Sequence, residues 1–120
     1  MKIRILPFFL LPILLLSSCT NDSTDDLVSF DPNQEVKYST SIKNIIDNNC
    51  LQCHGSTPSF GAPMSLTTYE EVKDAVLNRG LIDRISRTEG STGAMPLGAQ
   101  RLPQVTIDLI SQWEDEGLAE

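Results

Sequence analysis

Apolar residues recur with the spacing of a helix in three stretches of the chain. In residues 38–50, Ile42, Ile45 and Ile46 fall at positions i, i+3 and i+4, which places them on one helical face. Ser39 or Ser41 precedes this face and predicts an N-cap. The pattern therefore predicts a first helix that ends near Cys50.

The second stretch covers residues 66–80. Thr67 or Thr68 stands just before Glu70 and Glu71, which is typical of a helix that begins with a capping box. Gly80 is suited to the C-terminal end of this helix. The predicted buried face consists of four residues: Tyr69, Val72, Val76 and Leu77.

The third stretch covers residues 102–117, where Gly117 ends the predicted helix. Residues 81–87 predict a further short helical turn. Two loops rich in Gly, Ser and Pro separate these elements, at 55–65 and 88–100, and no pair of strands is evident. The apolar face of the third helix comprises Ile107, Leu109, Ile110 and Trp113.

These elements predict an all-α domain over residues 37–120, with three to five short helices and long loops. Loops of this length are uncommon in so small a domain unless they have something to pack against. Small domains also have little apolar area and often depend on a metal, a disulfide or a cofactor. The pattern therefore favours a domain organised around a bound group.

The first residues have the features of an exported leader. Lys2 and Arg4 precede an apolar run from Ile5 to Leu16, which spans only ~18 Å as a helix. A membrane-spanning helix needs ~20 residues. Residues 1–18 are therefore predicted to be a signal peptide.

The segment Leu16-Ser17-Ser18-Cys19 resembles the lipobox of bacterial lipoproteins. The resemblance implies cleavage before Cys19 and a lipid on its sulfur, which would anchor the protein in the bacterial cell envelope. Thr20 rather than an aspartate follows Cys19, which favours the outer membrane, facing the periplasm, with the cell surface as an alternative. An ordinary cleavage site beside a chance cysteine is the other interpretation of this segment.

Charge is the main feature of the next segment. Residues 19–36 contain five acidic residues and no basic one, which predicts a solvated tether. The whole chain has a formal charge of −7, and loss of Lys2 and Arg4 leaves seven basic residues against 16 acidic ones. A chain this negative repels phosphate backbones, which argues against nucleic acid as a partner.

The motif Cys50-x-x-Cys53-His54 carries the clearest chemistry in the chain. C-x-x-C-H is the attachment site of c-type haem. Two thiols on one helical turn can bond the two vinyl groups of the porphyrin, and the adjacent imidazole can bind the iron as proximal ligand. The motif therefore predicts one covalent haem c held by Cys50, Cys53 and His54.

The cysteine pair has three other interpretations. A zinc site needs about four ligands, but His54 is the only histidine and Cys19 is assigned to lipid. A thioredoxin-like redox pair normally follows a strand, whereas this pair follows a predicted helix. A structural disulfide between Cys50 and Cys53 is no better supported. Haem attachment is the interpretation that uses every cysteine.

The second axial ligand must come from something other than histidine. Met1 leaves with the leader, so Met64 and Met95 remain. Met95 lies between small residues and Pro96, in a loop suited to pressing a thioether against iron, and is the predicted distal ligand. The other interpretation of Met95 is a loop methionine that covers apolar surface. Met64 lies only ten residues from His54 and has the context of a packing residue.

Taken together, these motifs resemble the small bacterial monohaem class I cytochromes c. The resemblance covers roughly residues 38–118 and depends on CxxCHG, on Met95-Pro96 and on the closing segment DLISQWEDEG. It implies a class I cytochrome c-like fold wrapped around one haem, with Trp113 near the crossing of the first and last helices. It also implies that a loop carbonyl, expected at Pro58 or Pro63, accepts a hydrogen bond from the ring of His54.

The expected function is electron transfer through a His54/Met95-ligated iron, without enzymatic activity of its own. The expected partners are redox proteins with a basic docking patch, since the domain is acidic. One alternative is a haem-based sensor or small peroxidase whose distal position is open or labile. A second is a non-redox lipoprotein in which the cysteine pair only staples a loop.

Overall fold

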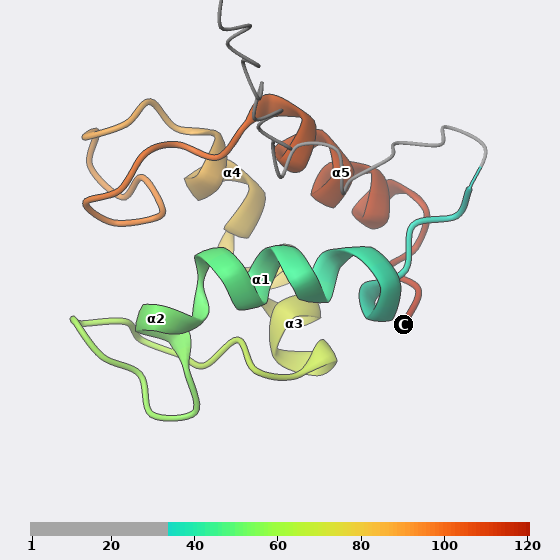
Figure 1. Cartoon of the computed structure of the whole chain (residues 1–120), viewed down its shortest axis with the longest axis horizontal. Helices are drawn as coiled ribbons and strands as arrows, with labels where there is room; N and C mark the ends of the chain where they lie inside the picture. The colour runs from blue at the N-terminus through green and yellow to red at the C-terminus, as the bar shows by residue number, and fades with distance from the viewer. Residues whose placement is uncertain (1–33) are drawn as a thin grey trace, which may run out of the picture.

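The computed structural model describes residues 34–120, and this part of the chain is all-α, without a strand. Figure 1 shows its helices and the long loops between them. The helical segments are η2 (Tyr38–Ile42), α1 (Lys43–Asn49), α2 (Leu51–His54), α3 (Tyr69–Arg79), α4 (Leu81–Ser86) and α5 (Gln104–Asp115). The predicted fold class is confirmed at this level.

Segments η2, α1 and α2 follow one another almost without interruption and form the predicted first helix. Ile42, Ile45 and Ile46 are buried, as their spacing predicted. The serine N-cap was wrong, because η2 begins directly after Lys37 without a side-chain cap, and both serines lie inside it as a π-helical turn. The backbone N–H of Tyr38 instead donates to the carbonyl of Ala119 at 2.9 Å, which satisfies one of the amides left open at a helix start.

Helix α3 begins with the predicted capping box, formed by Thr68 and Glu71. Val72 and Val76 are buried as predicted, but Leu77 is 54% exposed and the prediction was wrong there. Ala75 takes its place in the core, since it lies three residues after Val72 on the same face. Gly80 ends the helix in the left-handed region, at a φ of 67°.

Helix α5 packs against the start of the first helix through a group of aromatic rings. Trp113 is fully buried, with its ring centroid 6.0 Å from that of Tyr38 and 6.3 Å from that of Tyr69. Its indole Nε1–H donates to the carbonyl of Ala119 at 2.8 Å. All four predicted apolar residues of this helix are buried.

The two ends of the described chain lie close together, at the end of the domain opposite the loops that follow α2 and α4 (Figure 1). The N–H of Val36 donates to the Glu116 carboxylate at 2.7 Å, and Val36 is itself buried. The packed part therefore includes Val36, the last residue of the predicted tether. The predicted signal peptide, the lipid site Cys19 and most of the tether lie outside the described residues.

None of the helices in residues 34–120 has the length and apolar character that crossing a membrane requires.

Candidate functional site

The C-x-x-C-H motif occupies the junction between α1 and α2. Cys50 lies between the two helices, and its carbonyl accepts hydrogen bonds from the N–H of Cys53 at 3.2 Å and of His54 at 2.9 Å. The motif therefore makes a single helical turn, and all three side chains line one cavity. This is the local geometry that the residue spacing predicted.

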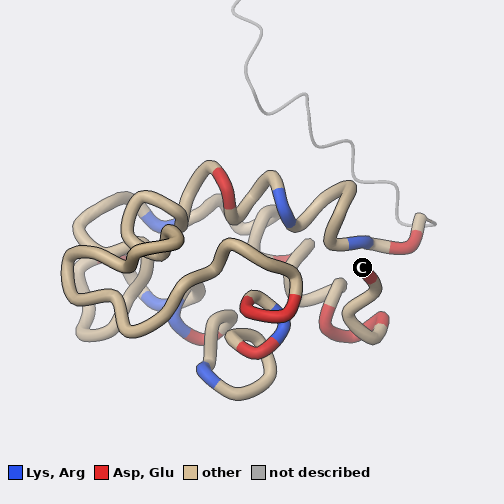
Figure 2. The backbone as a smooth tube through the Cα atoms, turned by 90° about the horizontal axis from the view of Figure 1, so that it is seen from below, with Lys and Arg blue, Asp and Glu red and all other residues tan. Residues whose placement is uncertain are grey.

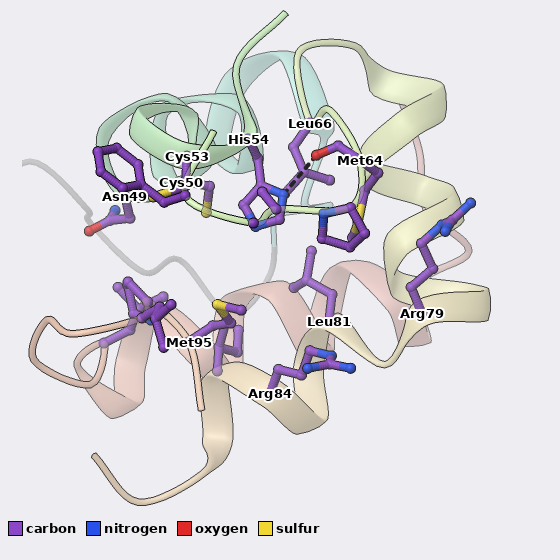
Figure 3. Close-up of a pocket in the computed structure, with 18 of the residues that line it drawn as sticks. Asn49, Cys50, Cys53, His54, Met64, Leu66, Arg79, Leu81, Arg84 and Met95 are labelled. Atoms are coloured by element: carbon purple, nitrogen blue, oxygen red, sulfur yellow. Dashed lines mark hydrogen bonds between the residues drawn. The ribbon is translucent and has the colours of Figure 1, made fainter. Parts of the chain in front are cut away.

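The imidazole of His54 is buried, at 9% exposure, and is oriented by one hydrogen bond. Its Nδ1 lies 2.8 Å from the carbonyl oxygen of Met64 (Figure 3). A carbonyl only accepts, so Nδ1 carries the proton, and Nε2 of the neutral ring keeps a free lone pair. The expectation of Pro58 or Pro63 as acceptor was wrong, although the acceptor does come from the same loop.

The loop after α2 is also tied to the backbone of His54. The N–H of Leu66 donates to the His54 carbonyl at 2.8 Å, and the N–H of Ser59 donates to the Cys53 carbonyl at 2.9 Å. Hydrogen bonds thus hold residues 55–66 against the helix turn that carries the motif. This loop supplies one wall of the cavity through residues 60–64 and Leu66.

The two thiols are free and are not joined to each other. Burial, with a smaller contribution from nearby Cys53, raises the pKa of the Cys50 thiol to about 11. Redox-active Cys-x-x-Cys pairs have the opposite property, with a pKa of ~3.5–7.5. The environment of Cys50 therefore does not favour a thioredoxin-like role.

Met95 lies on the wall across the cavity from the His54 ring (Figure 3). The loop that carries Met95 follows α4, and the N–H of Met95 donates to the carbonyl of Arg84 in that helix at 3.0 Å. Met64 also lines the cavity, and its carbonyl is the acceptor that orients His54. The structure thus brings both candidate methionines to the site in which the sequence placed only Met95.

The cavity has a volume of about 470 Å³, which lies within the ~300–1,000 Å³ typical of sites for small molecules and cofactors. Its lining is largely apolar and contains no acidic residue. Arg79 and Arg84 lie on the side away from the cysteines (Figure 3). These two arginines could not be identified as site residues from the sequence, because ordinary helix ends also carry arginine.

Charge is unevenly distributed around the cavity. No Asp, Glu, Lys or Arg occurs from Asn48 to Tyr69 or from Gly90 to Gln100, the segments that contain the cavity loops, residues 55–65 and 90–100. Acidic residues gather instead toward the end with the C-terminus (Figure 2). The cavity therefore opens between uncharged loops in a protein that is acidic overall.

Among residues 34–120, no group of three or more His, Cys, Asp or Glu side chains is placed to hold a metal ion. Compared with known proteins, the chain matches no family model, no curated protein and no solved structure. The function therefore has to be inferred from the residues and geometry of the chain itself.

Proposed function

We propose that the protein is an electron-transfer monohaem c-type cytochrome with a class I cytochrome c-like arrangement. One observation carries the proposal: the His54 imidazole and the Met95 side chain lie on opposite walls of one apolar cavity that Cys50 and Cys53 also line. Cys50, Cys53 and His54 come from one helical turn, whereas Met95 lies 41 residues after His54 in a separate loop. Their convergence is what a covalently bound, axially ligated haem requires.

The residues of the cavity fit haem c in their chemistry. Free thiols at Cys50 and Cys53 would form the two thioether bonds, and His54 offers a neutral nitrogen whose lone pair is available to a metal. The apolar lining suits a porphyrin face. Arg79 and Arg84, away from the cysteines, suit the carboxylate groups of the same molecule.

Within this proposal, bound haem would supply a reversible one-electron change at iron. His54 and Met95 would hold the iron from both sides, and thioether ligation favours the reduced state. The hydrogen bond from Nδ1 to the Met64 carbonyl fixes the orientation of the proximal imidazole. No other group in the cavity is arranged for bond chemistry on a substrate, so the proposal is a carrier and not an enzyme.

Three further proposals follow from the sequence. Cys19 would carry a lipid that tethers the domain to the cell envelope, in the outer membrane facing the periplasm. The signal peptide would be residues 1–18. The partners would be redox proteins with a basic docking patch, attracted by the net negative charge.

The test is the intact mass of the exported protein together with a pyridine haemochrome spectrum of its membranes. We expect one covalent haem, and we expect none in the double variant Cys50→Ser/Cys53→Ser. The variant Cys19→Ser is the matched control, because it should retain the haem and lose only the membrane attachment. A protein without the mass of a porphyrin would contradict the proposal.

A further inference from the structure

The loop that carries Met95, residues 88–100, folds back on itself through successive turns. The hydroxyl and N–H of Ser91 both donate to the carbonyl of Thr88, at 2.6 and 3.1 Å, and the N–H of Ala94 donates to that of Ser91 at 3.0 Å. Ala94 is buried, although it lies in the loop. These bonds shape the loop but do not fix it to the rest of the domain.

The loop is connected to helix α4 by the N–H of Met95, which donates to the carbonyl of Arg84 at 3.0 Å, and by the side chains of Arg84 and Arg87. Arg87, the residue that follows α4, donates from one terminal nitrogen to the carbonyl of Thr92 at 2.7 Å. Its Nε and other terminal nitrogen donate to the Asp83 carboxylate, at 3.1 and 2.6 Å. Asp83 lies one helical turn before Arg87 and therefore holds the guanidinium in the direction of the loop.

Gly93, next to Thr92, leaves space for this guanidinium beside the loop backbone. Its φ of +76° favours glycine, and a Cβ added there would lie 2.5 Å from a terminal nitrogen of Arg87. The terminal nitrogen of Arg84 also lies 3.5 Å from the Gly93 carbonyl. The missing side chain at Gly93 is thus what lets Arg87 reach the loop, two residues before Met95.

We propose that Asp83, Arg87 and the Thr92–Gly93 backbone form a latch that holds Met95 at the distal side of the cavity. Arg87 is a positioning residue in this proposal, since it acts on Met95 through the loop and does not line the cavity. The inference rests on the proposed function, in which Met95 binds the iron. The latch means that the Asp83–Arg87 ion pair, which lies outside the cavity, controls how firmly Met95 is retained as a ligand.

The latch predicts how easily an added ligand replaces Met95. Exogenous imidazole can bind the ferric protein only when the loop opens, so its apparent affinity depends on the fraction of molecules in the open form. Arg87→Gln should therefore tighten imidazole binding about tenfold, the factor that corresponds to ~1.4 kcal/mol. Asp83→Asn should shift the affinity in the same direction by less, because Arg87 can still reach Thr92.

Lys43→Gln is the matched control, because Lys43 and Asp47 also form a surface ion pair with (i, i+4) spacing, but on α1. It removes the same charge without touching the loop, and its imidazole affinity should equal that of the wild type. Gly93→Ala tests the latch without removing Arg87: the added methyl group would displace the guanidinium and should also tighten imidazole binding. The double variant Asp83→Asn/Arg87→Gln should bind imidazole no more tightly than Arg87→Gln alone.

Two other measurements separate the latch from general stability. Haem content by pyridine haemochrome and the thermal unfolding midpoint should remain close to wild type in Arg87→Gln, while the imidazole affinity changes. Equal affinities for Arg87→Gln and Lys43→Gln, in proteins that contain covalent haem, would overturn the latch and leave the proposed function standing. Absence of haem from the wild-type protein would overturn the proposed function first.

Discussion

The two methionines of the cavity have different roles, because the carbonyl of Met64 accepts the hydrogen bond from His54 Nδ1. Met64 orients the His54 ring through its backbone carbonyl, and its side chain contributes to the lining. Met95 lies on the opposite wall, where its side chain is the proposed second ligand of the iron. Substituting each methionine in turn can therefore show which side chain binds the iron and which only lines the cavity.

Met95→Ala is expected to abolish the weak far-red band that marks methionine bound to ferric iron. Met64→Ala should keep the band, because alanine retains the carbonyl that accepts the bond from His54. The ferric absorption spectra of both purified variants provide the measurement. A wild-type protein that is high-spin and binds CO or peroxide readily would indicate the sensor or peroxidase alternative instead.

Site residues whose association depends on local spacing could be predicted from the sequence. Site residues whose position depends on the path of a loop could not. Cys50, Cys53 and His54 lie on one turn, so their association could be predicted from the chain alone. The carbonyl that accepts from His54 could not, because every residue of the loop carries an equivalent one. Arg87 gave no signal either, since its target is backbone five residues away.

The start of helix α3 shows how a short motif fixes an element. The side chain of Glu71 accepts hydrogen bonds from the N–H and hydroxyl of Thr67 and from the N–H of Thr68, and its own N–H donates to the Thr68 hydroxyl. Thr68→Ala removes the cap and should lower the free energy of unfolding by ~1 kcal/mol. Chemical denaturation of the haem-loaded protein measures this, with Thr57→Ala, at an exposed threonine outside the cap, as a comparison.

The same cap should depend on pH in a defined direction. Hydrogen bonds, first that from the Thr67 side chain, lower the pKa of Glu71 below its ordinary value of 4.5. A group whose pKa is lowered by folding stabilises the fold above its ordinary pKa and loses this contribution as the pH falls through the lowered value. Glu71→Gln should therefore lower the thermal midpoint at pH 7, and the difference from wild type should shrink as the pH falls below 4.5.

Helices with their own start and stop signals in the sequence could be predicted. Errors in the predicted caps and buried residues arose where tertiary contacts took the place of such signals. The cap at Thr68 and the end at Gly80 both match the structure. The first helix has no side-chain cap, because the chain's other end supplies the acceptor at Ala119. Leu77 was predicted to lie in the core because it is apolar. Its position on α3 instead exposes it to solvent, and Ala75 is buried.

Trp113 connects the beginning, middle and end of the described chain. Its ring contacts those of Tyr38 and Tyr69, and its N–H donates to the carbonyl of Ala119. Trp113→Ala should lower the free energy of unfolding by ~3–5 kcal/mol, the range for loss of a large buried side chain. Trp113→Phe keeps most of the ring packing and should cost less, which urea denaturation of both variants can check.

The distribution of charge bears on how the domain meets its partner. Residues 34–120 carry 12 acidic and seven basic side chains, and those from 108 to 120 include five acidic residues and no basic one. Attraction to a basic partner should weaken as salt screens it, so the electron-transfer rate should fall with rising ionic strength. Rates that do not change with salt would remove the proposal of a basic partner and would point to the uncharged cavity loops as the contact.

The overall arrangement was predictable only to the level of an all-α domain. The spacing of apolar residues identified the helices, but the approach of the loops 55–65 and 88–100 to one cavity depends on individual hydrogen bonds such as those of Leu66 and Met95. Such bonds leave no periodic pattern in a sequence. The predicted association of Met95 with the cysteine motif therefore came from the ligands that haem iron accepts and from the loop context of Met95, and not from the pattern of apolar positions.

Because Val36 and Ala119 lie at the end of the domain away from the cavity, a linkage made ahead of Gln34 would not obstruct the cavity mouth. Molecules immobilised on an electrode through that side would present their uncharged loops to the bulk solution. Soluble redox molecules would then approach freely, while the distance from the electrode would slow direct exchange with the solid. In the proposed cytochrome, the point of attachment would thus be separate from the point of electron entry.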